Sequence, residues 1–265
     1  MKLDSFGGRS ALVTGAASGI GLAVATHLGN RGATFLLNDL AGDALHRAVG
    51  TVPNATGIAA DLSTRSGALE LADAAKGVDI LVNNAGLQHV SPIEDFDPNR
   101  WDLMLAIMLT ARFLLIRGIV TGMYERGFGR IVNISSVHGL VASPFKSAYV
   151  SSKHGLIGLT KTVALEAAQR AVDVTCNAVC PSYVRTPLVE QQLADQARIH
   201  GLSESEVLEK VLLTNNAVRR LIEPEDVARA VAYLCAPESW SMTGTVMTLD
   251  AGWLAHLLPS TVGTD

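Results

Sequence analysis

The segment Thr14-Gly15-Ala16-Ala17-Ser18-Gly19-Ile20-Gly21 decides the fold of this chain. It follows a short apolar run over Ala11–Thr14, typical of a strand, and it precedes a helical pattern over Leu22–Asn30. The glycines allow a tight turn and a close approach of the backbone to a ligand. Because free N–H groups at a helix N-terminus bind phosphate, the segment predicts a turn that holds the pyrophosphate of a dinucleotide. A tight turn without a ligand is the alternative.

Outward from this turn, short apolar runs alternate with longer helical patterns. Continuous apolar strands separated by helices are typical of a parallel sheet covered on both faces. Right-handed crossovers then give an α/β, doubly wound, Rossmann-like sheet, in which ligands bind at the carboxyl ends of the strands. After the first strand, the expected strands are Ala33–Asn38, Ile58–Ala60, Ile80–Asn83, Ile131–Ser135, Val174–Val179 and Val246–Leu249.

The domain organisation follows from the absence of any internal repeat or low-complexity linker. We therefore expect a single domain over all 265 residues. Segment 187–216 lies between the sixth and seventh expected strands and is polar and helical in pattern. An insertion at the carboxyl end of the sheet is placed to act as a lid, which is our interpretation of this segment. A tail over residues 255–265 follows the last strand and its loop.

Composition and charge exclude several classes of protein. Hydrophobic residues make up 48% of the chain and charged residues 17%, which excludes a disordered chain. The formal net charge is −4 without a basic cluster, so we expect neither nucleic acid nor an anionic membrane as a partner. Thr110, Arg112 and Arg117 interrupt the apolar stretch Met104–Val120, which argues against a membrane span.

The cysteines and the N-terminus indicate a cytoplasmic protein. Cys176, Cys180 and Cys235 form no Cys-x-x-Cys pair and lie at no metal-binding spacing with histidines. We therefore expect reduced core thiols and no metal. The first ten residues contain no apolar signal region.

An acidic residue, Asp39, ends the second expected strand, where this fold places the adenosine ribose of a dinucleotide. A carboxylate there accepts hydrogen bonds from both ribose hydroxyls and repels a 2′-phosphate. No arginine or lysine adjoins Asp39 in the sequence. The sequence therefore favours NAD over NADP. An aspartate that only caps the loop is the alternative.

Tyr149 and Lys153 are four residues apart on a helical segment, so they share one helix face. A tyrosine has an ordinary pKa of about 10, and an ammonium together with the positive nicotinamide favours its phenolate. Tyr149 then accepts the proton of an alcohol as hydride leaves for the nicotinamide, while Ser136, after the fifth strand, holds the substrate oxygen. We expect these three residues to catalyse the interconversion of an alcohol and a ketone, with an acid–base contribution of roughly 10²–10⁴-fold.

Over about residues 6–253 the chain resembles the short-chain dehydrogenases/reductases. The resembling segments are TGAASGIG at 14–21, Asp39, Asp61-Leu62, Asn83-Asn84-Ala85-Gly86, Ser136, Tyr149 with Lys153, and Pro181 to Thr186. The residues that the resemblance places against the cofactor are Gly15, Ser18, Gly19, Ile20, Gly21, Asp39, Asp61, Leu62, Asn84, Ala85, Gly86, Tyr149, Lys153, Val184 and Thr186. It implies that Lys153 binds the nicotinamide ribose.

Within that family the chain is most similar to the bacterial D-3-hydroxybutyrate dehydrogenases, in the segments Asn83–Phe96, Val137–Lys153 and Val184–Gln192. Lys146 lies three residues before Tyr149 and so brings a cation near the reacting carbon. The side chains of Gln88, His138 and Gln192 can donate hydrogen bonds to a carboxylate. The resemblance gives all four residues that role. Their alternatives are a solvated lysine, two glutamines of turn and lid surface, and a loop histidine.

Two aromatic residues are expected at the substrate pocket. Tyr183 stands where typical hydroxybutyrate dehydrogenases have tryptophan, and Ser182 replaces the usual glycine. The smaller ring widens the pocket, which leaves open a dehydrogenase for a bulkier alcohol or ketone. Trp253 is expected to close the pocket.

Position 108 departs from the family pattern. The resemblance implies an asparagine there, which helps hold a water that links the lysine to solvent, but the chain has Met108. A thioether is a weak acceptor and cannot donate. The proton relay is therefore expected to differ, and a weakly active NAD-binding regulatory protein stays open as an alternative.

Two long helical patterns favour self-association. The segments Met104–Val120 and Ser152–Ala168 are too apolar to remain solvated on their outer faces. The family pairs these helices between subunits, so we expect a homotetramer.

Overall fold

The computed structural model describes residues 5–170, 173–187, 189–190, 193, 197 and 201–255. A parallel sheet forms its centre, with the strand order β3-β2-β1-β4-β5-β6-β7. The doubly wound fold predicted from the sequence is thereby confirmed. The strands are β1 (Ser10–Thr14), β2 (Thr34–Asp39), β3 (Ala55–Ala59), β4 (Ile80–Asn83), β5 (Phe128–Ile134), β6 (Asp173–Pro181) and β7 (Val246–Leu249).

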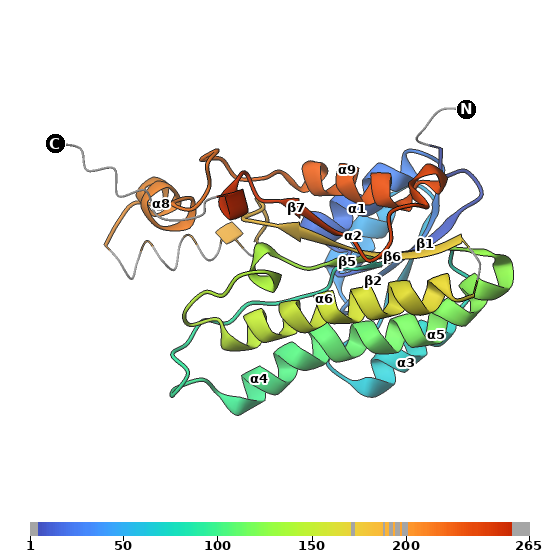
Figure 1. The fold of residues 1–265 in the computed structure, drawn as a ribbon, viewed down its shortest axis with the longest axis horizontal. Helices are drawn as coiled ribbons and strands as arrows, with labels where there is room; N and C mark the ends of the chain where they lie inside the picture. The colour runs from blue at the N-terminus through green and yellow to red at the C-terminus, as the bar shows by residue number, and fades with distance from the viewer. Residues whose placement is uncertain are drawn as a thin grey trace.

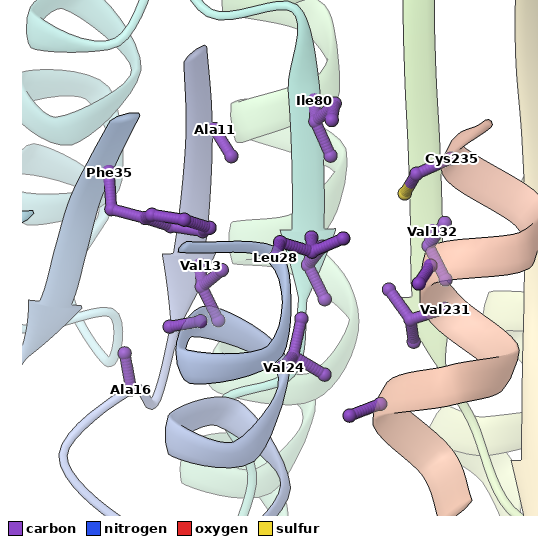
Figure 2. Close-up of a cluster of buried hydrophobic side chains, with 14 of the residues drawn as sticks. Ala11, Val13, Ala16, Val24, Leu28, Phe35, Ile80, Val132, Val231 and Cys235 are labelled. Atoms are coloured by element: carbon purple, nitrogen blue, oxygen red, sulfur yellow. The ribbon is translucent and has the colours of Figure 1, made fainter. Parts of the chain in front are cut away.

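Helices cover both faces of the sheet (Figure 1). On one face lie α1 (Gly19–Gly29), α2 (Asp43–Thr51) and α9 (Pro224–Cys235). On the other lie α3 (Arg65–Ala74), α5 (Ala111–Arg126) and α6 (Ser147–Ala168). Further helices are α4 (Pro98–Leu105) and the short α8 (Glu204–Val207). Figure 2 shows the first face, where Val24 and Leu28 of α1 lie over the sheet and Val231 of α9 lies beside Val132.

The strand bounds show where apolar runs are a good guide and where they are not. Ile80–Asn83 and Val246–Leu249 are the observed bounds of β4 and β7. The expected strand Ile58–Ala60 is wrong in its bounds, because β3 is an edge strand with exposed small and polar residues and begins at Ala55. The fifth strand also begins earlier, at Phe128, and ends at Ile134.

Between the sixth and seventh strands, the described part of segment 187–216 forms an apolar cluster of its own. Val189 and Leu193 join Val207, Leu212 and Leu213 of the α8 region, and Tyr183 packs against this cluster. Only the first residue of the expected tail, Ala255, belongs to the described part of the chain.

The helical run Pro98–Arg126, which joins α4 to α5, is long and apolar enough by length and composition to cross a membrane. The sequence argument that charged residues interrupt this stretch therefore does not exclude a span by itself. In the described structure 44% of the most apolar window of this run is buried inside the protein, and α5 packs against α3. Core helices of proteins outside membranes pass the same test.

Gly21 is the most tightly packed glycine of the turn, since an added Cβ would overlap the carbonyl oxygen of Gly15. We expect Gly21→Ala to displace the turn, to lower the free energy of unfolding by about 1–3 kcal/mol and to weaken cofactor binding. Urea unfolding and cofactor titration measure both effects. Gly50→Ala is the control, because its Cβ meets nothing within 4 Å, and it should leave both quantities unchanged or raise stability slightly.

Candidate active site

The glycine-rich turn connects β1 to α1 and opens at the carboxyl edge of the sheet. Gly15 and Gly19 have φ angles of +62° and +52°, which side chains rarely tolerate, and α1 begins at Gly19. The carboxamide of Asn84 donates to the carbonyl oxygens of Thr14 and Gly15, and each donor–acceptor distance is 3.0 Å. These bonds fix the turn against the end of β4.

Asp39 caps this turn. Its carboxylate accepts from the backbone N–H of Ala17 at 2.9 Å and from that of Leu40 at 2.8 Å. The loop-capping alternative therefore describes a real contact. Asp39 also lines the main cleft, so the same carboxylate can face a ligand. The two roles are compatible, since a carboxylate has about four acceptor positions.

A cleft of about 470 Å³ runs along the carboxyl ends of the strands. It brings together nearly all the residues predicted to bind a cofactor. Those that line it are Gly15, Ser18, Ile20, Asp39, Asp61, Leu62, Asn84, Ala85, Gly86, Tyr149, Lys153, Val184 and Thr186. Gly19 and Gly21 lie in the turn beside it, and a Cβ on Gly19 would come within 3.1 Å of the Thr186 side chain. The lining residues of the cleft, the glycine turn and the N-terminus of α1 fit a dinucleotide.

The predicted catalytic residues meet on the wall of this cleft. Ser136, Tyr149 and Lys153 all line it, and the Lys153 Nζ lies 5.3 Å from the centre of the Tyr149 ring. That ammonium group donates to the carbonyl oxygen of Ile134, the last residue of β5, at 2.9 Å. Lys153 is therefore fixed by the end of a strand.

Burial governs the protonation of the pair. It raises the pKa of Tyr149 above its ordinary value, while a hydrogen bond with Ser136 and the charge of Arg112 lower it. Burial, followed by the charge of Arg112, holds the pKa of Lys153 well below its ordinary value. Sequence reasoning credited only Lys153 and the nicotinamide with favouring the phenolate. It missed Arg112, whose signal was an arginine inside an apolar stretch, four residues after Met108.

Met108 is fully buried, in a π-helical turn (Ala106–Thr110) between α4 and α5. Its sulfur lies 4.0 Å from the Ser152 hydroxyl and close to Gly86. Such turns are often found at functional sites. Met108 lines the cleft as a core residue, and its thioether brings no hydrogen-bond donor to Lys153.

A smaller pocket, of about 70 Å³, adjoins Ser136 and Tyr149. It is lined by most of the predicted substrate residues: Gln88, His138, Lys146, Tyr183 and Trp253. Gln192 lies outside the described residues. Gln88 has a second contact, because its side-chain oxygen accepts from the backbone N–H of His89 at 3.2 Å, as the turn alternative supposed.

Lys146 is buried, with 7% of its surface exposed, so the alternative of a solvated lysine is wrong. Its Nζ lies 3.3 Å from His138 Nε2 and 3.4 Å from the Tyr183 hydroxyl. The ring of Trp253 lies edge-on to His138, with 5.4 Å between centroids, and tilted against Tyr183 at 5.8 Å. A cation thus lies within an aromatic pocket beside the reacting groups.

The sheet, the glycine turn and the Ser136, Tyr149 and Lys153 group define an oxidoreductase with a nicotinamide dinucleotide site. The family described as short chain dehydrogenase matches residues 9–197, and the chain belongs to this family. The family assignment made from the sequence motifs is confirmed.

Two curated relatives are similar over nearly their whole length. The chain is 45% identical over 261 residues to a D-beta-hydroxybutyrate dehydrogenase of Rhizobium meliloti and 39% identical over 257 residues to one of Cupriavidus necator. Each alignment covers 94% of this chain and 99% of the relative.

Solved structures agree with the fold. A short chain dehydrogenase/reductase family protein matches with a TM-score of 0.84 and 32% identity, covering 97% of this chain and all of the other. A structure from Agrobacterium tumefaciens, provisionally assigned as a 2-deoxy-D-gluconate 3-dehydrogenase, matches with a TM-score of 0.84 and 30% identity over 97% of this chain and 100% of that one. That structure holds NADP.

The buried imidazole of His138 makes stability depend on pH. Burial, helped by the charge of Lys146, lowers its pKa from 6.5 to about 4. Between these values the unfolded chain binds more protons, so stability is present above pH 6.5 and is lost as pH falls toward 4. We expect a loss of roughly 3 kcal/mol at most across this range.

Urea unfolding of the wild type and of His138→Gln between pH 8 and 4 measures this dependence. The variant should lose the part of the slope that lies between pH 6.5 and 4. Identical slopes for both proteins would contradict a neutral, buried His138.

Proposed function

We propose that the protein is an NAD-dependent dehydrogenase that interconverts 3-hydroxybutyrate, or a similar short 3-hydroxy acid, and the corresponding 3-keto acid. The observation that carries the proposal is the buried ammonium of Lys146 in the pocket next to Ser136 and Tyr149. No carboxylate pairs with Lys146 among the ion pairs of the described residues. A buried cation without a counter-charge favours an anionic ligand.

The size of the pocket supports a short acid. At about 70 Å³ it is much smaller than the adjoining cleft of about 470 Å³. Aromatic rings of Tyr183 and Trp253 bound it. A carboxylate on Lys146 and the reacting carbon beside Tyr149 then fit a chain of few carbons. The curated names of the two relatives support the same substrate class.

Each residue has a distinct role in this proposal. The nicotinamide, when bound in the main cleft, supplies the hydride acceptor for oxidation. The Ser136 hydroxyl donates a hydrogen bond to the substrate oxygen, and the ionised Tyr149 hydroxyl accepts its proton as the C–H bond breaks and the C=O bond forms. Lys153 would hold the ribose of a bound cofactor, and its charge stabilises the phenolate. Lys146 fixes the carboxylate and so orients the reacting carbon.

The preference for NAD follows from Asp39. Its carboxylate lines the cleft beside the glycine turn, and its negative charge disfavours a 2′-phosphate. Among the described residues that line the main cleft, Lys153 is the one lysine or arginine. It lies beside Ser136 and Tyr149, at the end where the reaction is proposed to occur. The ribose end therefore offers a phosphate no cation from the described lining residues.

Three further expectations from the sequence belong to the proposal: the oligomeric state, the cellular compartment and a lid over the pocket. Exposed apolar side chains, Phe113 on α5 and Leu165 on α6, support self-association to a homotetramer through these helices. The three buried, unpaired thiols suit the cytoplasm. The segment that begins at 187 adjoins the pocket through Val189 and is proposed as its lid.

The role of Lys146 can be tested by steady-state kinetics with NAD. Wild type should oxidise D-3-hydroxybutyrate, and Lys146→Met should raise the KM for this acid by about 100-fold, because about 2–5 kcal/mol is lost when a buried charge pair loses one partner. A neutral secondary alcohol is the control substrate, and its KM should change little. If bulky neutral alcohols outpace the hydroxy acid tenfold in the wild type, the substrate class is wrong. NAD binding without turnover of any of these substrates would favour a regulatory protein.

Cofactor preference gives a separate test. The wild type should use NAD at least about 100-fold better than NADP in kcat/KM, because a carboxylate repels the 2′-phosphate. Asp39→Asn preserves the shape and removes the charge, and its single amide oxygen can accept from only one of the two backbone N–H groups, of Ala17 and Leu40, that the carboxylate binds. This variant should narrow the ratio by about tenfold or more. Equal use of both cofactors by the wild type would contradict the role given to Asp39.

A further inference from the structure

Arg112 is a buried cation that contacts the backbone of two residues lining the cleft, Ala85 and Ile134. It is the second residue of α5 and only 2% of its surface is exposed. Its guanidinium donates to the carbonyl oxygen of Ile134 at 2.9 Å and to that of Ala85 at 2.8 Å. A longer bond, of 3.4 Å, reaches the carbonyl oxygen of Asn84. Arg112 therefore ties the end of β5 to the loop that follows β4.

The carbonyl of Ile134 connects Arg112 to the catalytic lysine. Lys153 Nζ donates to this same oxygen, also at 2.9 Å. Two buried cationic side chains thus share one acceptor. The carbonyl oxygen that fixes the position of the Lys153 ammonium group is therefore itself held in place by Arg112.

The charge of Arg112 has no carboxylate partner. None of the ion pairs in the described part of the chain includes it, and burial lowers its pKa to about 10. The group whose ionisation stabilises this guanidinium is Tyr149. An unpaired buried charge costs several kcal/mol, and such a cost is typical of functional sites. An apolar side chain in this place would carry no such cost.

We propose that Arg112 is a positioning residue of the reaction: its guanidinium fixes the carbonyl that holds Lys153 and supplies a permanent positive charge behind Tyr149. This inference deepens the proposed function and needs from it only that Tyr149 exchanges the proton. Met108, one turn earlier, offers no donor that would share this task. The proton is passed between the substrate oxygen and Tyr149, and Arg112 keeps its own protons throughout.

Several titratable groups face Tyr149, and their states decide which charges matter. Burial holds the pKa of His138 at about 4 and raises those of Tyr183, to about 12, and Cys180, so these groups are neutral near pH 7. The groups around Tyr149 are Arg112 on α5, Lys153 on α6, Cys180 on β6, His138 and Tyr183 flanking the substrate pocket, and Lys146 beside these two.

The direction of the effect does not depend on how the pair shares its protons. A fixed positive charge makes proton loss easier for every nearby group, and Arg112 lowers the pKa of both Tyr149 and Lys153. The apparent pKa values of a coupled pair therefore both rise when this charge is removed. Oxidation needs the deprotonated base, so its pH profile should move to higher pH.

The pH profile of kcat/KM for alcohol oxidation tests this. Arg112→Gln keeps a hydrogen-bonding side chain without the charge, and it should raise the apparent pKa of the basic group by about one unit or more. Arg112→Lys keeps a charge and should restore the pKa to within about half a unit of wild type. A folded, cofactor-binding Arg112→Gln with an unchanged pKa would overturn the proposal.

Arg130→Gln is the matched control. Arg130 is another fully buried arginine, but it lies near the start of β5 and pairs with Asp173, the first residue of β6, at the amino ends of the strands and away from the cleft. Its loss should lower the free energy of unfolding without moving the pH profile. If Arg130→Gln and Arg112→Gln shift the profile equally, the effect is general destabilisation and Arg112 has no specific role.

A second readout needs no substrate. The tyrosinate absorbance of the NAD-bound enzyme, minus that of Tyr149→Phe, reports the ionisation of Tyr149 directly. Its pKa should rise in Arg112→Gln as it does in the rate. If this shift is found while 3-hydroxybutyrate is not oxidised, the proposed substrate is wrong and the role of Arg112 stands.

A third measurement does not need the Arg112→Gln variant and can be made even if that variant does not fold. In arginine-labelled enzyme, one guanidinium NMR signal should titrate together with Tyr149 and should stop titrating in Tyr149→Phe. The absence of any arginine signal that follows Tyr149 would overturn the proposal.

Discussion

The position of the glycine turn depends on two hydrogen bonds, which the Asn84 carboxamide donates to the carbonyl oxygens of Thr14 and Gly15. Here β1 and β4 are neighbours in the sheet, although the chain reverses its direction of winding between them. Helices leave to opposite faces at such a switch point, which opens a crevice at the carboxyl edge. The two hydrogen bonds link the end of β1 to the end of β4. They therefore fix the position of the glycine turn relative to the loop after β4.

Buried charge is the second organising feature. Lys146, Lys153 and Arg112 are all largely buried, and they are held by hydrogen bonds to carbonyl, phenol or imidazole groups. In a site of low dielectric, each charge acts strongly on an anionic substrate or a phenolate. In the proposed mechanism the two ends of the substrate therefore have separate cations: Lys146 holds the acid group, and Lys153 and Arg112 support the proton transfer.

The predictability of the fold and the site differed with the kind of signal. Buried strands such as Ile80–Asn83 were predicted with their bounds, because an apolar run reports burial on both faces. The edge strand β3 was misplaced, since one side of it has no partner strand and its exposed residues carry no apolar pattern. Arg112 was interpreted only as an interruption of an apolar helix. A charge inside an apolar pattern does not reveal which carbonyl oxygens will receive it.

The sequence by itself determined the local chemistry of this protein: the glycine turn, the acidic residue Asp39 at the end of β2, and the spacing of Tyr149 and Lys153 on one helix. These features depend on neighbours within a few residues, where backbone geometry fixes who meets whom. Only the tertiary structure decided that Lys146 is buried beside His138 and that Arg112 shares the Ile134 carbonyl with Lys153. Those contacts join separate segments of the chain, and burial, which sets their electrostatic strength, exists only after the segments have packed together.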